Sequence, residues 1–144
     1  MRAWSSARWS IPLPPEHRFP IAKYAMIRDG VLARGLLPAG AIEEPDPVCL
    51  TALGRVHTPE YIAAIRDAAL APRDARRLGF PACPELWERS ARTVQGTVEA
   101  AADALRTGAG INLAGGTHHA YPGHGEGYCT FNGVAIAIRD LQAA

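Results

Sequence analysis

The sequence has little net charge, few cysteines and no long apolar run. Its 144 residues include 15 lysines and arginines against 14 aspartates and glutamates, a net charge of +1. This balance offers no basic field for nucleic acid, and no run of like charge marks an interaction tail. No segment approaches the ~20 apolar residues that span a bilayer, and the N-terminus lacks the apolar core of a signal peptide. We therefore expect neither a nucleic-acid nor a membrane partner.

The cysteines are odd in number and scattered, at Cys49, Cys83 and Cys129. They form neither a disulfide framework nor a CxxC metal pair, which favours a reducing compartment, so we expect a cytoplasmic protein. The composition is globular, with 48% hydrophobic residues, and the length fits one domain over residues 1–144.

Proline punctuates the first third of the chain. Residues 11–20 hold four prolines and cannot be the interior of a helix. Short strands are expected at 1–6 and 41–43. Between them we predict a helix with Pro20 as its first residue and Gly35 at its end. Its apolar face would consist of Ile21, Tyr24, Ile27 and Val31.

Two further helices have strong start signals. Thr58-Pro59-Glu60 combines a capping hydroxyl, a proline in the first turn and an acid at the positive end of the helix dipole. The buried face of that helix would be Tyr61, Ile62, Ile65 and Ala69. Pro84 opens a long helix over about 84–106 that Gly108 ends. It carries an apolar stripe of Trp87, Ala91, Val94, Val98, Ala101 and Leu105, with Glu85–Arg89 and Glu88–Arg92 as pairs on the solvent side.

The segment 110–114 is short and apolar enough for a buried strand. A long amphipathic helix that leads into such a strand is half of a βαβ unit, which predicts an α/β fold with a parallel sheet. Further on, Asn132 can cap a helix over 133–141 with Val134, Ile138 and Leu141 on one face. The alternation of Val134, Ile136 and Ile138 also permits a strand there.

A glycine-rich loop over 115–132 carries the clearest chemical signal, the adjacent pair His118 and His119. Ligands bind at the carboxyl ends of strands in open α/β sheets, where this pair would lie. Near neutral pH one imidazole can take a proton while its neighbour stays cationic and stabilises negative charge. Without its flanks, an adjacent histidine pair is more often a solvated loop pair or a chance neighbour than a catalytic pair.

The flanking residues resemble those of the zinc-dependent histone deacetylases and their bacterial relatives. Upstream matches are weaker, and together the similar segments cover essentially the whole chain. They are Gly115–Ala120, Gly127–Cys129, Phe131-Asn132, Val134–Ala137, His17–Pro20 with Lys23-Tyr24, Val56–Tyr61 and Arg76–Pro81. Such an ordered set is far more specific than a lone motif. All of it is similar to the N-terminal half of the family's domain.

The resemblance implies an arginase-like three-layer α/β fold, with a parallel sheet covered by helices on both faces. It implies Zn²⁺ as cofactor and hydrolysis of an acetylated lysine or amine. His119 matches the general base that later protonates the leaving amine, and His118 matches the residue that orients substrate and stabilises charge. Gly127 and Tyr128 match the wall of the tunnel that holds the acetyl-lysine arm.

Three residues of the loop and its flank depart from the pattern or allow two interpretations. Tyr128 stands where phenylalanine is usual, so its hydroxyl needs a partner or an exit to water. Gly133 replaces an aspartate, which removes an acidic group from a helix N-terminus. Cys129 matches a cysteine beside the site, although we favour a small buried apolar residue there.

The family's metal ligands and its transition-state tyrosine follow the segment at which this sequence ends. The remaining histidines, His17, His57 and His124, have no spacing typical of a zinc site; His57 is interpreted as a local hydrogen-bonding residue and His124 as solvent-facing. No metal ligand is therefore assigned. The sequence supports two hypotheses: an incomplete and inactive portion of a zinc-dependent deacetylase, or a short, catalytically dead relative that serves as a binding module.

Overall fold

The computed structural model describes residues 1–144 apart from the side chain of Ala39. Strands β1 (Arg2–Trp4), β2 (Ile42–Glu43) and β3 (Gly110–Asn112) form a parallel sheet in the order β2-β1-β3. In the central strand, Ala3 pairs with Ile42 on one side and with Ile111 on the other. The expected parallel sheet is confirmed, with strands shorter than the apolar segments that predicted them.

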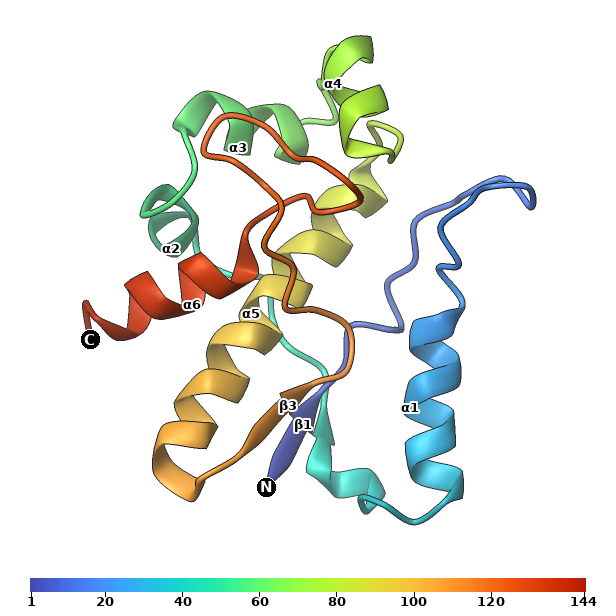
Figure 1. Cartoon of the computed structure of the whole chain (residues 1–144), viewed down its shortest axis with the longest axis vertical. Helices are drawn as coiled ribbons and strands as arrows, with labels where there is room; N and C mark the ends of the chain where they lie inside the picture. Colours follow the sequence, from blue (N-terminus) through green and yellow to red (C-terminus); the bar gives the residue numbers. More distant parts are fainter.

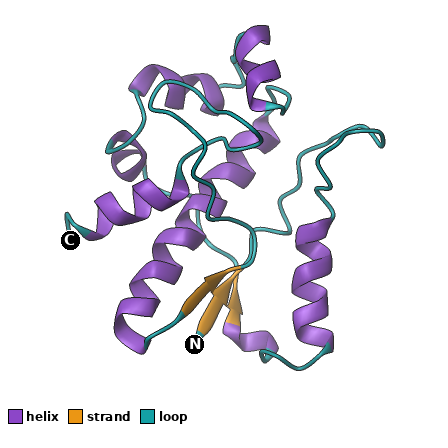
Figure 2. Ribbon diagram, in the orientation of Figure 1, coloured by secondary structure: helices purple, strands orange, loops and turns teal.

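Helices surround this small sheet on both sides, as Figure 1 shows. They are α1 (Lys23–Ala33), α2 (Leu50–Gly54), α3 (Pro59–Arg66), α4 (Pro72–Leu78), α5 (Pro84–Thr107) and α6 (Gly133–Leu141), with a 3-10 turn η1 (Ala39–Ala41) before β2. α5 packs on one side of the sheet and α1 stands on the other, while α2, α3, α4 and α6 gather around α5. Figure 2 shows how little of the chain is strand. The α/β class is confirmed.

The predicted helix starts hold wherever a capping signal is present, whereas α3 ends at Arg66, and Ala69, expected in its buried face, is exposed. Thr58 Oγ1 accepts the Tyr61 N–H at 3.3 Å and begins α3. Pro84 lies in the first turn of α5, and Gly108 ends that helix with φ of 91°. Asn132 Oδ1 accepts the Ala135 N–H at 3.0 Å, so residues 133–141 form the helix α6 and not a strand.

The prediction for α1 was only partly correct. The helix begins at Lys23 and not at Pro20, because residues 20–22 form turns and Ala22 provides no side-chain cap. Gly35 ends it with φ of 62°, as expected. None of its side chains is buried, and Ile27, assigned to the apolar face, is 43% exposed.

The face of α6 was predicted wrongly. Its buried residues are Gly133, Ile136 and Ala137, while Val134 and Ile138 are exposed. Two of the three buried residues are small, which allows α6 to lie close against α5.

Two residues of α5 and one of β3 also differ from expectation. Arg89 is buried and makes no ion pair with Glu85 among the described residues, whereas the Glu88–Arg92 pair forms at 3.3 Å. Leu105, expected in the stripe, is 77% exposed. β3 was expected as a buried strand, but none of its three residues is buried and Ile111 is exposed.

The short helices α2 and α4 were not predicted. At five and seven residues they are too short for a hydrophobic period to be visible. α4 does carry the boundary signals that identified α5, namely Pro72 in its first turn and Gly79 in the left-handed region after it.

The contact between α5 and the sheet depends on glycine. A Cβ on Gly96 of α5 would lie 3.2 Å from Trp4 Cβ, and a Cβ on Gly110 of β3 would clash with the Ala100 carbonyl. The main apolar core lies on the other side of α5, where Leu53, Ile65, Leu86, Phe131 and Ile136 are fully buried. None of the helices in the described residues is long and apolar enough to cross a membrane.

We expect Gly110→Ala to destabilise the protein by about 1–3 kcal/mol, because the added methyl group forces α5 away from β3. Gly30→Ala is the matched control: Gly30 lies inside α1 and an added Cβ meets nothing within 4 Å. This control should raise stability by about 0.5–1 kcal/mol through helix propensity. Urea denaturation measures both changes, and equal effects would contradict the close α5–β3 contact.

Candidate active site

The loop that carries the histidine pair leaves the carboxyl end of β3. In Figure 1 it runs from β3 past α3 and α4 and returns to α6. Gly115 permits its departure, because a Cβ there would lie 2.5 Å from Thr93 Cγ2 of α5. His118 and His119 are both exposed, with ring centroids 4.3 Å apart and an interplanar angle of 38°. The structure therefore brings the two imidazoles together at the sheet edge where ligands bind in α/β folds.

Asn132 fixes the backbone around this pair. While its Oδ1 caps α6, its Nδ2 donates to the carbonyl oxygens of His118 at 3.2 Å and Ala120 at 3.5 Å. One amide side chain thus joins the start of α6 to the histidine segment. The cap was predicted, but the two bonds from Nδ2 were not.

Cys129 holds the same segment from the other side. Its side chain is fully buried, as favoured from the sequence, and it also accepts the Ala120 N–H at 3.2 Å and donates to the Phe131 carbonyl at 3.3 Å. Its thiol is therefore both a packing group and a hydrogen-bonding group.

His57 lies beneath the loop, with 3% of its surface exposed. Its Nε2 accepts the Asn132 N–H at 3.0 Å, so the proton of a neutral ring lies on Nδ1, which donates to the Pro122 carbonyl at 3.3 Å. Burial lowers the pKa of His57 below its ordinary value of 6.5, against the weaker opposing effect of the Pro122 and Tyr121 carbonyls. His57 forms hydrogen bonds as expected, but the expectation of local partners was wrong, because the bonded residues lie 65 and 75 positions away in the sequence.

Gly127 and Tyr128 both adopt left-handed backbone conformations, with φ of 56° and 65°. For tyrosine this conformation is uncommon. It is held by the bond from Tyr128 N–H to the Leu78 carbonyl at 2.8 Å. Gly79 is required beside it, since a Cβ there would lie 2.6 Å from the Tyr128 ring.

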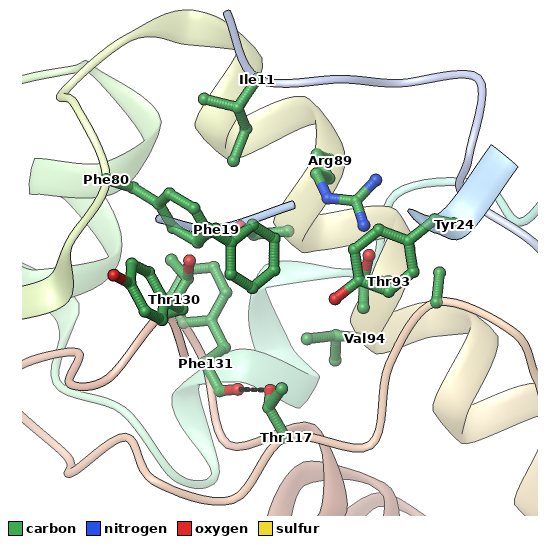
Figure 3. Close-up of a pocket in the computed structure, with 13 residues that line it drawn as sticks. Ile11, Phe19, Tyr24, Phe80, Arg89, Thr93, Val94, Thr117, Thr130 and Phe131 are labelled. Carbon is green, nitrogen blue, oxygen red and sulfur yellow. Dashed lines mark hydrogen bonds between the residues drawn. The ribbon is translucent and has the colours of Figure 1, made fainter. Parts of the chain in front are cut away.

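The Tyr128 ring belongs to an aromatic cluster at one wall of a cavity. Its ring centroid lies 5.0 Å from that of Phe19 and 5.4 Å from that of Phe80. The cavity measures about 40 Å³, and Figure 3 shows Phe19 and Phe80 on one side of it, Tyr24 on the other and Thr117 bonded to the Phe131 carbonyl. Gly127, His118 and His119 do not line this cavity. The structure thus separates the wall residue Tyr128 from the exposed histidine pair.

Arg89 is a residue of this cavity that sequence reasoning missed. Its guanidinium lies 4.2 Å from the centroid of the Tyr24 ring and donates to the Ser6 and Trp9 carbonyls at 3.3 and 2.9 Å. Burial lowers its pKa, and the neighbouring Tyr24 hydroxyl opposes that effect. Its spacing from Glu85 was typical of a surface pair, and no local pattern marked it as buried.

The described residues do not fit a zinc ion. They contain no group of three histidine, cysteine, aspartate or glutamate side chains that could hold a metal. Two of the remaining histidines already bind protein groups: His17 Nε2 lies 3.0 Å from the Gly79 carbonyl, and His57 bridges Pro122 and Asn132.

Comparison with known proteins identifies the family. The profile of the histone deacetylase domain matches residues 17–144. The chain belongs to the histone deacetylase family. It is 38% identical over 131 residues to an uncharacterized protein of Picosynechococcus, covering 91% of this chain and 44% of that protein. It is 31% identical to the acetoin utilization protein AcuC of Staphylococcus xylosus, covering 88% of this chain and 36% of that protein.

The family's fold is shared as well. The crystal structure of a histone deacetylase homolog complexed with SAHA superimposes with a TM-score of 0.75 at 21% identity, covering 99% of this chain and 41% of that one. The three-layer architecture expected from the loop motifs is thereby confirmed. The chain spans less than half the length of these relatives of the histone deacetylase family.

The two roles of Asn132 can be separated by substitution. Asn132→Asp keeps a capping oxygen, so α6 should lose less than about 0.5 kcal/mol. It removes both donors from Nδ2, so amide hydrogen exchange should accelerate in residues 118–120 and not in 133–141. Asn132→Ala should affect both segments and cost about 0.5–2 kcal/mol. Equal protection of 118–120 in the wild type and Asn132→Asp would argue against the anchoring role.

The lowered pKa of His57 predicts a pH-dependent stability. Between the folded-state pKa and the ordinary 6.5, the unfolded protein binds more protons than the folded one. The His57 contribution to the free energy of unfolding is therefore complete above pH 6.5 and decreases as the pH falls below it. Urea denaturation across this range measures it. The slope should be smaller in His57→Gln, and an identical slope in both proteins would contradict the assignment.

Proposed function

We propose that this chain contributes the proton-transfer residues and part of the acyl-binding wall of a zinc-dependent deacetylase that acts on an acetylated lysine or a similar acetylated amine. The observation that supports this most directly is the contact of the His118 and His119 rings, 4.3 Å apart, on a backbone anchored by Asn132. Family membership supports the class of reaction, and a relative of the same fold binds SAHA.

In this proposal the two histidines divide the work of amide hydrolysis. His119 takes a proton from the attacking water and later gives it to the nitrogen of the leaving amine, so the proton balance closes over one cycle. His118 orients the substrate and stabilises the negative charge that develops on the carbonyl oxygen. The two rings are neighbours and both are accessible, so substrate and water can reach them.

Gly127 and Tyr128 are proposed to bind the acyl-lysine arm. The Tyr128 ring is half-buried and offers an apolar surface to a methylene chain, and its hydroxyl is on a side chain that still reaches solvent. Gly127 leaves space beside it, since a Cβ there would meet nothing within 4 Å. The left-handed backbone at both residues turns the loop so that the ring faces Phe19 and Phe80.

The zinc ion that the family implies has no group of ligands among the described residues. We therefore propose that residues 1–144 alone bind acetylated substrate weakly and do not hydrolyse it. The alternative, a binding module that has lost catalysis, predicts the same behaviour for the chain by itself. The two hypotheses differ in an active preparation that contains this chain. Substitution of the histidine pair lowers turnover there under the deacetylase proposal, and leaves turnover unchanged under the binding-module alternative. We also propose a cytoplasmic location, because the cysteines are free and scattered.

The test compares histidine variants in an active preparation that contains this chain, with an acetyl-lysine peptide as substrate. His119→Gln should lower kcat by about 10²–10⁴-fold, the usual contribution of a general base. His118→Gln should lower kcat by a smaller factor.

His124→Gln, on the same loop, is the control and should leave kcat within about twofold. Turnover that survives His119→Gln unchanged would rule out the assigned role, and turnover by the purified chain alone would show that it is catalytically complete.

A further inference from the structure

His57 binds both ends of the segment that carries Gly127 and Tyr128. It comes from the connection between α2 and α3, and its ring packs against Tyr61 and Phe131 at centroid distances of 5.6 and 5.2 Å. Its Nδ1 side meets the Pro122 carbonyl and its Nε2 side meets the Asn132 N–H. A single buried ring therefore spans the loop from residue 122 to residue 132.

Asn132 connects His57 to the segment that carries the histidine pair. Its backbone N–H is held by His57, while its side chain holds the His118 and Ala120 carbonyls. The Pro122 carbonyl, held by His57 on the other side, also accepts the Thr58 N–H at 2.9 Å. The backbone on both sides of His119 is thus tied to the same buried imidazole.

We infer that neutral His57 is a positioning residue, which holds the loop in the geometry that presents His118 and His119. The functional part of this inference rests on the proposed role of His118 and His119 in proton transfer. The structural part, that both nitrogens of His57 are needed to hold the loop, can be tested without any activity.

The inference requires the neutral ring because the two contacts have opposite polarity. An imidazolium has a donor at each nitrogen and would face the Asn132 N–H donor to donor. The groups that face His57 are the backbone of Tyr121, Pro122 and Asn132 and the rings of Tyr61 and Phe131. Tyr61 is the titratable one among them; burial raises its pKa, and its hydroxyl donates to the Thr130 carbonyl at 2.7 Å. No described charged side chain therefore compensates a cation at His57.

Amide hydrogen-exchange protection of residues 118–135 in the 144-residue chain tests the inference with three variants. His57→Phe keeps the ring packing and removes both hydrogen bonds. His57→Gln restores an acceptor near the position of Nε2 and does not titrate in this range. His124→Phe changes a histidine of the same loop whose ring contacts only neighbouring loop residues, namely Tyr121, Gly125 and Glu126, among its described partners.

We expect His57→Phe to lower protection at Asn132 by about tenfold or more, the effect of losing one buried hydrogen bond. His57→Gln should recover part of the loss, and His124→Phe should match the wild type. Because burial lowers the pKa of His57, protection in the wild type should also fall as the pH decreases below its ordinary value of 6.5, and His57→Gln should not show this dependence.

The inference is overturned if Asn132 is as well protected in His57→Phe as in the wild type. It is also overturned if protection of Asn132 in the wild type does not change with pH. The pH series needs no variant, so it decides the matter even where His57→Phe fails to fold. Failure of the proposed function is a separate result: it would leave these exchange data intact and appear as full activity in His119→Gln.

Discussion

Ala100 of α5 and Gly110 of β3 lie so close that no side chain fits between them. This contact fixes the start of β3, the strand that leads into the histidine loop, against α5. Beyond it, Asn112 Nδ2 donates to the Thr93 carbonyl and to Thr97 Oγ1 of α5, at 2.8 and 2.9 Å. Gly115 then passes against Thr93 itself. The start of the loop is thus fixed by α5 through successive backbone and side-chain contacts, and a shift of α5 would move the histidine pair with it.

The far end of the loop is fixed by other means. Polar groups that are buried, or half-buried in the case of Asn132, hold it, and each has its partner: Asn132 caps α6, Cys129 binds Ala120, and His57 bridges Pro122 and Asn132. A buried hydrogen bond contributes about 1 kcal/mol on balance but costs more when one partner is left alone. A network of this kind therefore favours one loop geometry over its alternatives more than it raises overall stability.

The sequence was most informative where a signal is local. Helix starts at Thr58-Pro59, Pro84 and Asn132 were predicted correctly because caps and prolines act within one turn. The apolar faces of α1 and α6 were predicted less well, since periodicity shows that a helix has two faces and not which one a neighbour covers. In α6 the buried face includes Gly133 and Ala137, which a count of large apolar residues overlooks. Arg89 was misplaced for the same reason: its spacing from Glu85 resembles a surface pair, while its actual partners are carbonyls at Ser6 and Trp9.

The same distinction applies to the candidate site and bears on its chemistry. The pair His118-His119 is adjacent in sequence, so its proximity was predictable, and Tyr128 could be assigned through the resemblance of its motif. The bridging role of His57 could not be predicted, because its partners lie 65 and 75 residues away.

The resulting site has a backbone held by hydrogen bonds and side chains that are exposed. Both imidazoles face water in the described residues, and a charge on an exposed ring is stabilised by solvent as well as by substrate, so it discriminates poorly between ground state and transition state. The hydrogen bonds of the loop position the two imidazoles but leave them exposed to water. The proposed hydrolysis requires in addition that the rings be shielded from water, so that His118 acts on the developing oxyanion in a medium of low dielectric constant.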